Sequence, residues 1–105
     1  MPQKSVFAIT NVRIDSKGNS STANMGIFED FDLAEKLVLE NAMDINEGGY
    51  YPYVVIEQLS LNSIYFIGKN KDFITRWYLW EGKEEGSYKP CDQPDFAKGL
   101  VHWIG

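Results

Sequence analysis

Residues 51–59 read YPYVVIEQL, the most strand-like stretch of the chain. β-Branched and aromatic residues favour strands, and the unbroken apolar run from Val54 to Ile56 is typical of a strand that is buried on both faces. A proline inside a central strand would delete a ladder hydrogen bond, so we expect pairing to begin at Tyr53, directly after Pro52. The stretch predicts the central strand of a sheet.

Strand-like segments lie on both sides of it. Residues 6–14 and 22–28 flank the turn-forming sequence DSKGNS and are expected to form a hairpin. Residues 64–67 and 73–81 flank a second turn and are expected to form another hairpin, and residues 87–91 a short edge strand. Alternation along 73–81 predicts two opposite sets of side chains: Phe73, Thr75, Trp77 and Leu79 on one face, and Ile74, Arg76, Tyr78 and Trp80 on the other.

One amphipathic helix is predicted from about residue 33 to about residue 43. Its apolar residues recur at spacings of three and four, which places them along one stripe of a helix. They are Leu33, Ala34, Leu37, Val38 and Ala42. Asp32 is expected to cap the first turn, with Glu35 reaching back in a capping box, and the helix is expected to stop before Gly48 and Gly49.

These elements predict a single α+β domain over residues 1–105. It has one amphipathic helix on a mainly antiparallel sheet of five or six strands, in the order β-β-α-β-β-β, with residues 92–105 as a C-terminal tail. One helix cannot cover both faces of such a sheet, so the second face is either filled by the tail or offered to a partner. Because residues 100–104 (LVHWI) are more apolar than a free end should be, we expect a homo-oligomer, most simply a dimer.

The composition excludes several classes of protein. The chain has 105 residues, of which 44% are hydrophobic and 24% charged, with a net charge of −5, and these values exclude a disordered or low-complexity chain. The single cysteine, Cys91, cannot form an internal disulfide. No apolar run reaches the roughly 18 residues of a membrane span, and the first residues lack the apolar core of a signal peptide. We therefore expect a cytoplasmic protein with no membrane partner.

Several segments carry a resemblance to other proteins. Residues 44–57 (DINEGGYYPYVVIE), WYLW at 77–80, YKPC at 88–91 and the glycine-ended tail together resemble a group of small uncharacterised bacterial and phage proteins. The resemblance implies a small α+β domain and no established activity, so it transfers no catalytic residue to this chain. A phage origin would favour an inhibitor or a protein that sequesters a ligand.

Residue types for catalysis and metal binding are sparse. Nucleophilic catalysis needs a nucleophile and a base within hydrogen-bond reach, and the chain has one cysteine and one histidine, Cys91 and His102. The acidic, glycine-closed segment at 44–49 does not fit a twelve-residue calcium loop, because Gly48 and Val55 stand where ligands are required. We therefore predict a protein that is not an enzyme and has no metal site and no cofactor.

Binding of nucleotides or nucleic acid is not favoured either. The phosphate-binding glycine motifs of dinucleotide-binding proteins and nucleotide hydrolases are missing from the sequence. Basic and aromatic residues between 69 and 80 could stack on nucleic-acid bases, but the net charge of −5 opposes binding to phosphates. Nucleic acid is therefore not expected as a partner.

Glu57 stands in the most apolar strand. A buried carboxylate there needs a partner, such as Arg76 or a tyrosine hydroxyl. A structural ion pair and a functional carboxylate are the two interpretations of this residue.

Charge is unevenly distributed along the chain. Residues 29–57 carry eight acidic residues and one basic residue, whereas the remainder carries seven acidic and nine basic residues. An acidic face of this kind keeps a protein soluble, steers a basic partner, or mimics the charge of nucleic acid.

Two functions remain open. The first is a non-catalytic, small acidic binding module that docks on another protein, for example as a phage or bacterial inhibitor. The second is an oligomeric protein that binds or sequesters a small planar, nucleotide-like ligand by stacking it on aromatic rings. The candidate binding residues are Glu40, Asp44, Glu47, Tyr50, Tyr51, Tyr53, Arg76, Trp77 and Trp80.

Overall fold

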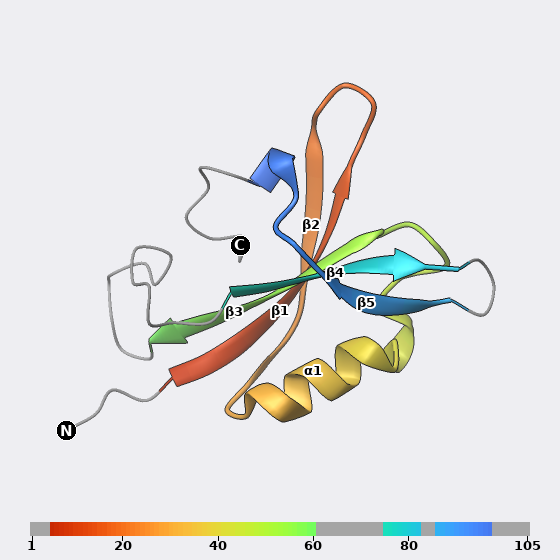
Figure 1. The fold of residues 1–105 in the computed structure, drawn as a ribbon. Helices are drawn as coiled ribbons and strands as arrows, with labels where there is room; N and C mark the ends of the chain where they lie inside the picture. Colours follow the sequence, from red (N-terminus) through yellow and green to blue (C-terminus); the bar gives the residue numbers. More distant parts are fainter. Residues whose placement is uncertain (1–4, 61–74, 83–85, 98–105) are drawn as a thin grey trace.

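The computed structural model describes residues 5–60, 75–82 and 86–97. Within these ranges the sheet has five strands: β1 (Ser5–Ile14), β2 (Ser20–Phe28), β3 (Tyr53–Ser60), β4 (Thr75–Glu81) and β5 (Ser87–Cys91). They lie in the order β2-β1-β3-β4-β5, and each neighbouring pair is antiparallel (Figure 1). One α-helix, α1 (Phe31–Leu39), follows β2 and packs on one side of the sheet. The chain is therefore a single α+β domain with the predicted order β-β-α-β-β-β.

β3 is the central strand, as the sequence predicts. It pairs with β1 on one side and β4 on the other, and its register begins with Tyr53 opposite both Val12 and Leu79. Its apolar run from Val54 to Ile56 is fully buried. The predicted hairpin of β1 and β2 is also confirmed. The strand expected at 64–67, and with it the second predicted hairpin, falls outside the described residues.

The face of the sheet under α1 holds the larger core. Ala34 and Val38 of the helix have no exposed surface. They belong to a buried cluster of Phe7, Ile9, Ala34, Val38, Ile45, Val54, Ile56, Tyr78 and Tyr88. Full burial of one aliphatic or aromatic side chain contributes roughly 1.5–3 kcal/mol, so this cluster is the main attachment between the helix and the sheet.

The opposite face of the sheet carries a second, smaller core. Val12, Val55 and Trp77 are buried there against Ala97, which belongs to a 3-10 helix, η3 (Asp95–Ala97). Figure 1 shows η3 across the sheet from α1. Trp77 and Tyr78 therefore lie on opposite faces, as alternation predicts, and residues near the C-terminus fill the face around Trp77. The apolar residues 100–104 that suggest a dimer fall outside the described residues.

Both ends of α1 differ from the prediction. The N-cap is Asp30, not Asp32: Asp30 has extended backbone dihedrals, and its carboxylate accepts a hydrogen bond of 2.9 Å from the N–H of Asp32. This start lets Phe31, the first helical residue, pack edge-to-face on Phe7 with 5.6 Å between ring centroids. The helix ends at Leu39, before Gly48, because Asn41 adopts the left-handed conformation that often follows a helix C-terminus.

Candidate functional site

An open cleft of about 600 Å³ lies where the loop after α1 meets the end of β4. We call residues 41–51 the cleft loop; it contains a second 3-10 helix, η1 (Ala42–Asp44). Among the described residues, those that line the cleft come from this loop and from the end of β4 and the residue after it: Asn41, Asp44, Asn46, Gly48, Gly49, Trp80 and Gly82. The volume falls within the range of roughly 300–1,000 Å³ that is usual for ligand sites.

The cleft loop is held in place by hydrogen bonds that buried polar side chains make. Nδ2 of Asn11 in β1 donates to the carbonyl oxygen of Ile45 at 3.1 Å. Asn46, only 3% exposed, donates from Nδ2 to the carbonyl oxygen of Tyr51 at 2.9 Å and to the hydroxyl of Tyr88 at 3.4 Å. That hydroxyl donates in turn to the same Tyr51 oxygen at 2.6 Å. Burial raises the pKa of Tyr88 to about 12, so the phenol keeps its proton and remains a donor at neutral pH.

The backbone of the cleft loop is strained. Four of its non-glycine residues have positive φ angles: Asn41 at 50°, Met43 at 52°, Asp44 at 56° and Glu47 at 50°. Asn and Asp tolerate this conformation, but other side chains lose about 1–2 kcal/mol in it. Met43 is 98% exposed, so burial does not offset its strain. Strain of this kind persists where the surroundings fix the backbone, and it is concentrated at functional sites.

Trp80 is the aromatic wall of the cleft, and its indole is held in place from two sides. The ring meets Tyr88 edge-to-face with 5.0 Å between centroids. On its nitrogen edge lies Gly86, where an added Cβ would be only 2.5 Å from Nε1 of Trp80. The backbone N–H of Trp80 donates to the carbonyl oxygen of Pro52 at 2.8 Å, which ties β4 to the end of the cleft loop.

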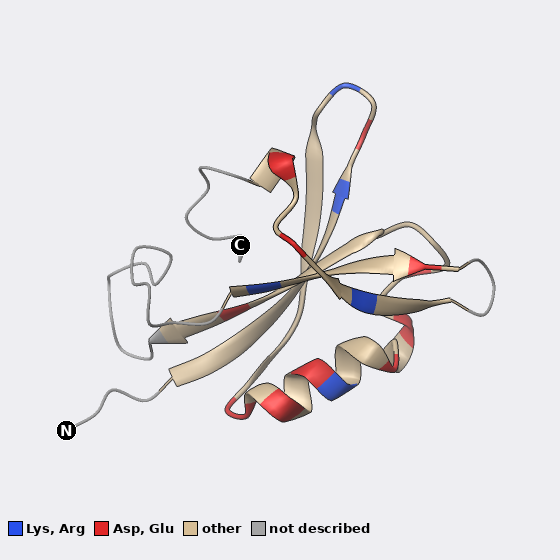
Figure 2. Cartoon of the chain, in the orientation of Figure 1, with Lys and Arg blue, Asp and Glu red and all other residues tan. Residues whose placement is uncertain are grey.

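Acidic residues run along α1 and continue into the cleft loop, as Figure 2 shows. We call residues 29–47 the acidic segment. This segment contains seven acidic residues and one basic residue, Lys36. Six of the seven acidic residues are exposed: Glu29, Asp30, Asp32, Glu40, Asp44 and Glu47. Arg13, the base beside the cleft loop, is engaged with Tyr50: its guanidinium lies 4.6 Å from the ring centroid, and Nη1 donates to the carbonyl oxygen at 3.1 Å.

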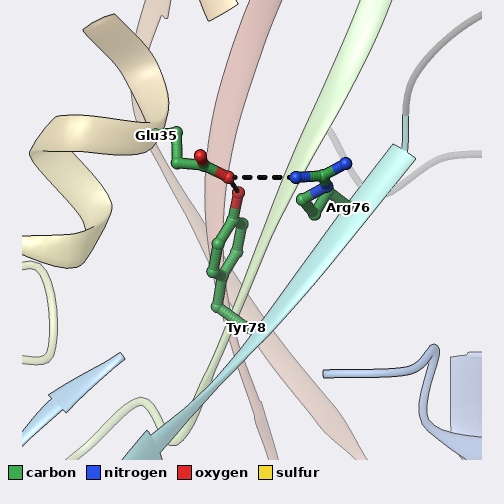
Figure 3. A network of polar contacts seen from close by, with 3 residues as sticks. All are labelled: Glu35, Arg76 and Tyr78. Carbon is green, nitrogen blue, oxygen red and sulfur yellow. Dashed lines mark hydrogen bonds and ion pairs between the residues drawn. The ribbon is translucent and has the colours of Figure 1, made fainter. Parts of the chain in front are cut away.

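The seventh carboxylate, Glu35, joins the helix to β4 (Figure 3). It accepts a hydrogen bond from the hydroxyl of Tyr78 and lies 3.4 Å from Nη1 of Arg76. Burial, followed by the neighbouring Glu35, raises the pKa of Tyr78 well above its ordinary value. Glu35 is thus part of a cross-element network, and the predicted capping box is not formed.

The same network corrects the prediction for Glu57. Arg76 lies opposite Ile56 on the face under α1, whereas Glu57 lies opposite Thr75 and so on the other face of the sheet. Arg76 therefore pairs with Glu35 and not with Glu57. Glu57 itself is only 3% exposed.

The structure separates the predicted binding residues into four groups. Asp44 and Trp80 line the cleft. Glu40 precedes the cleft loop, and Glu47, Tyr50 and Tyr51 belong to it; the two tyrosine rings meet edge-to-face at 4.7 Å. Arg76 lies farther along β4, and Tyr53 and Trp77 lie on the other face, where both rings contact Phe96.

The five aromatic rings proposed to stack on one ligand therefore do not form one surface. Within a strand, odd and even positions face opposite ways, which separates Trp77 from Trp80. The polar lining residues Asn41 and Asn46 were missed in the sequence. The signal that could have found them is the segment 41–49, where asparagines and glycines, the residues that tolerate positive φ, are frequent.

The described part of the chain offers little for catalysis or metal binding. It contains no group of three or more His, Cys, Asp or Glu side chains placed to hold a metal ion. Burial, followed by Asp92 and Glu81, raises the pKa of the Cys91 thiol, which disfavours the nucleophilic thiolate. His102 lies outside the described residues. None of the described helices is long and apolar enough to cross a membrane.

Comparison with protein-family models, curated proteins and solved structures finds no match to this chain, so its function is inferred from the site itself.

Proposed function

We propose that this chain is a non-catalytic binding module that docks a basic protein through the acidic segment. The observation that carries the proposal is the placement of Glu40, Asp44 and Glu47 at and just beyond the C-terminal end of α1. The C-terminal end of a helix is the negative end of its dipole, where a carboxylate costs about 0.3–1 kcal/mol. Glu40 is the C-cap residue, where local stability favours a basic residue, and Glu47 is exposed in the loop beyond it. An external positive partner accounts for these two acids better than local stability does.

The wider charge distribution supports the same partner. Six exposed carboxylates within residues 29–47 create a negative potential that attracts positive surfaces and speeds their association. Arg13 contacts Tyr50, and Arg76 pairs with Glu35, which is the one carboxylate of the acidic segment that is not exposed. A module that covers the basic surface of another protein blocks that surface, so inhibition is the activity that we propose for it.

The experiment compares the wild-type chain with the double variant Glu40→Lys, Asp44→Lys. Both are immobilised and exposed to a lysate, and proteins retained by the wild type alone are purified and titrated at salt concentrations from about 0.05 to about 1 M. The screening length falls to about 3 Å at 1 M salt, so affinity through exposed charges should fall steeply. An Asp92→Asn variant, which removes one exposed charge outside the acidic segment, serves as the control and should bind almost as well as the wild type.

Two results would contradict this proposal. The double variant could retain the same proteins as the wild type, or the affinity of every retained protein could be insensitive to salt. Apolar contacts are not weakened by salt, so the second result would point to the aromatic residues as the contact surface.

A small planar ligand is the second candidate, and the cleft beside Trp80 is the observation that favours it. Trp80 offers an aromatic wall, and glycines at 48, 49 and 82 leave room for a flat molecule to approach the backbone. Native mass spectrometry of the purified chain separates the two candidates, because a retained small molecule adds a discrete mass of a few hundred daltons and a retained protein adds far more.

A further inference from the structure

The cleft combines one aromatic wall with oxygen atoms that accept no hydrogen bond from the described residues. Oδ1 of Asp44 accepts from Nδ2 of Asn41 and from the N–H of Gly48, both at 3.3 Å. Its second oxygen, Oδ2, accepts no hydrogen bond from any described residue. Asn46 is 97% buried and uses both donor contacts of its Nδ2 on Tyr51 and Tyr88, while its Oδ1 has no donor within the described ranges.

These acceptors belong to Asp44 and Asn46, residues that line the same cleft as Trp80. A carboxylate oxygen and an amide oxygen accept hydrogen bonds and donate none from those atoms. The complementary ligand group therefore carries several N–H donors, a positive charge and a flat face that stacks on an indole.

Among biological cations, guanidinium meets all three requirements. It is planar, permanently charged and carries five N–H donors, and it stacks on aromatic rings. An ammonium group is compact and strongly hydrated, and it presents no flat face. The cleft, at about 600 Å³, also has room for the aliphatic stem that carries the guanidinium.

We propose that this cleft receives an arginine side chain of the partner protein, with the guanidinium against Trp80 and hydrogen-bonded to Asp44 and Asn46. This inference rests on the proposed function and specifies which side chain of the basic partner enters the cleft. The exposed carboxylates of the acidic segment attract the basic partner over a distance, and the cleft selects arginine over lysine at contact.

The test uses N-acetyl-L-arginine amide, which resembles an arginine within a peptide, titrated into isotope-labelled protein and followed by NMR. We expect saturable shifts of the Trp80 indole N–H and the Asn46 side-chain amide, at millimolar concentrations of probe. N-acetyl-L-lysine amide should bind roughly fivefold more weakly, since it loses the stacking and part of the hydrogen bonding. N-acetyl-L-citrulline amide, which has the same shape without the charge, should not saturate the site. Free L-arginine, with its added carboxylate and ammonium groups, distinguishes a side-chain site from a site for the free amino acid.

Two variants locate the probe. Asp44→Asn keeps the Oδ1 acceptor for Gly48 and tolerates the left-handed backbone, so the fold should survive while affinity for the arginine probe falls roughly fivefold. Trp80→Phe identifies the indole signal and removes part of the aromatic wall. Asp92→Asn is the charge-matched control and should leave the affinity within about twofold, because this exposed charge lies outside both the cleft and the acidic segment and is screened.

The results separate the two proposals. Equal binding of the arginine and citrulline probes, or shifts that avoid Trp80 and Asn46, would overturn the arginine site. If a partner then still bound in a salt-dependent way and was lost with Glu40→Lys, Asp44→Lys, the proposed function would stand without this site. Tighter binding of free L-arginine than of the amide would also overturn the side-chain site. Binding of the arginine probe without any salt-dependent protein partner would support the cleft and contradict the proposed function.

Discussion

Replacing Asn46 with alanine should loosen the cleft loop while leaving the sheet intact. The variant loses the 2.9 Å hydrogen bond from Nδ2 to the Tyr51 oxygen and the longer one to the Tyr88 hydroxyl. The Tyr51 oxygen keeps its 2.6 Å bond from Tyr88, so only the Tyr88 hydroxyl oxygen loses its donor, and that bond is a long one. A buried hydrogen bond contributes about 1 kcal/mol net, and the space left by the amide costs about 1 kcal/mol more. We expect a loss of about 2 kcal/mol, which corresponds to a fall in Tm of about 10 °C for a domain of this size.

The assay is urea denaturation combined with amide hydrogen exchange. The amide of Tyr51, which donates to the carbonyl oxygen of Asn46 at 3.1 Å, should exchange faster in the variant, whereas amides of the β1–β3 ladder should change only with global stability. Asn24→Ala is the matched control: Asn24 is exposed, and its Nδ2 makes one hydrogen bond of 3.2 Å to the Ile9 oxygen. Its loss should stay below about 1 kcal/mol.

Equal losses for the two variants, or unchanged exchange at Tyr51, would refute the conclusion that Asn46 holds the cleft loop.

Three further perturbations test the site. Met43→Asn should stabilise the protein by about 0.5–1 kcal/mol in urea denaturation, since asparagine tolerates the φ of 52°; a loss would contradict the strain. Gly86→Ala should destabilise by about 1–3 kcal/mol and shift tryptophan fluorescence, because the new Cβ would lie 2.5 Å from both the Glu81 backbone oxygen and Nε1 of Trp80. Unchanged fluorescence would show that the indole is not held there. The pKa of Tyr88 is raised from 10.0 to about 12, and that of Tyr78 is raised too, so the stability that these phenols contribute should be complete below pH 10 and fall as the pH rises toward 12. Tyr88→Phe should make this fall less steep. An equally steep fall in the variant would contradict the contribution of Tyr88.

The sequence by itself determined the central strand of the sheet and the division of the β4 side chains between its two faces. The run from Val54 to Ile56 predicts a central strand, and alternation along β4 predicts that Trp77 and Tyr78 face opposite ways. These features follow from the two-residue period of a strand and from the need to bury apolar surface, which are properties of a local segment. The same local reasoning identified Asp44 and Trp80 as binding candidates, but it could not place them in one cleft.

The tertiary structure decided which polar groups meet. Glu35 fits a capping box by its spacing, yet its carboxylate bonds Tyr78, which lies 43 positions away along the chain. Asn46 and Tyr88 contact each other across 42 positions and fix the cleft loop. A side chain near a helix end can bond its own backbone or a neighbouring element at similar free energy, so packing against the sheet makes the choice. The cleft exists only because α1 ends at Leu39, before the left-handed Asn41, and the loop then folds back onto the end of β4, which no local period encodes.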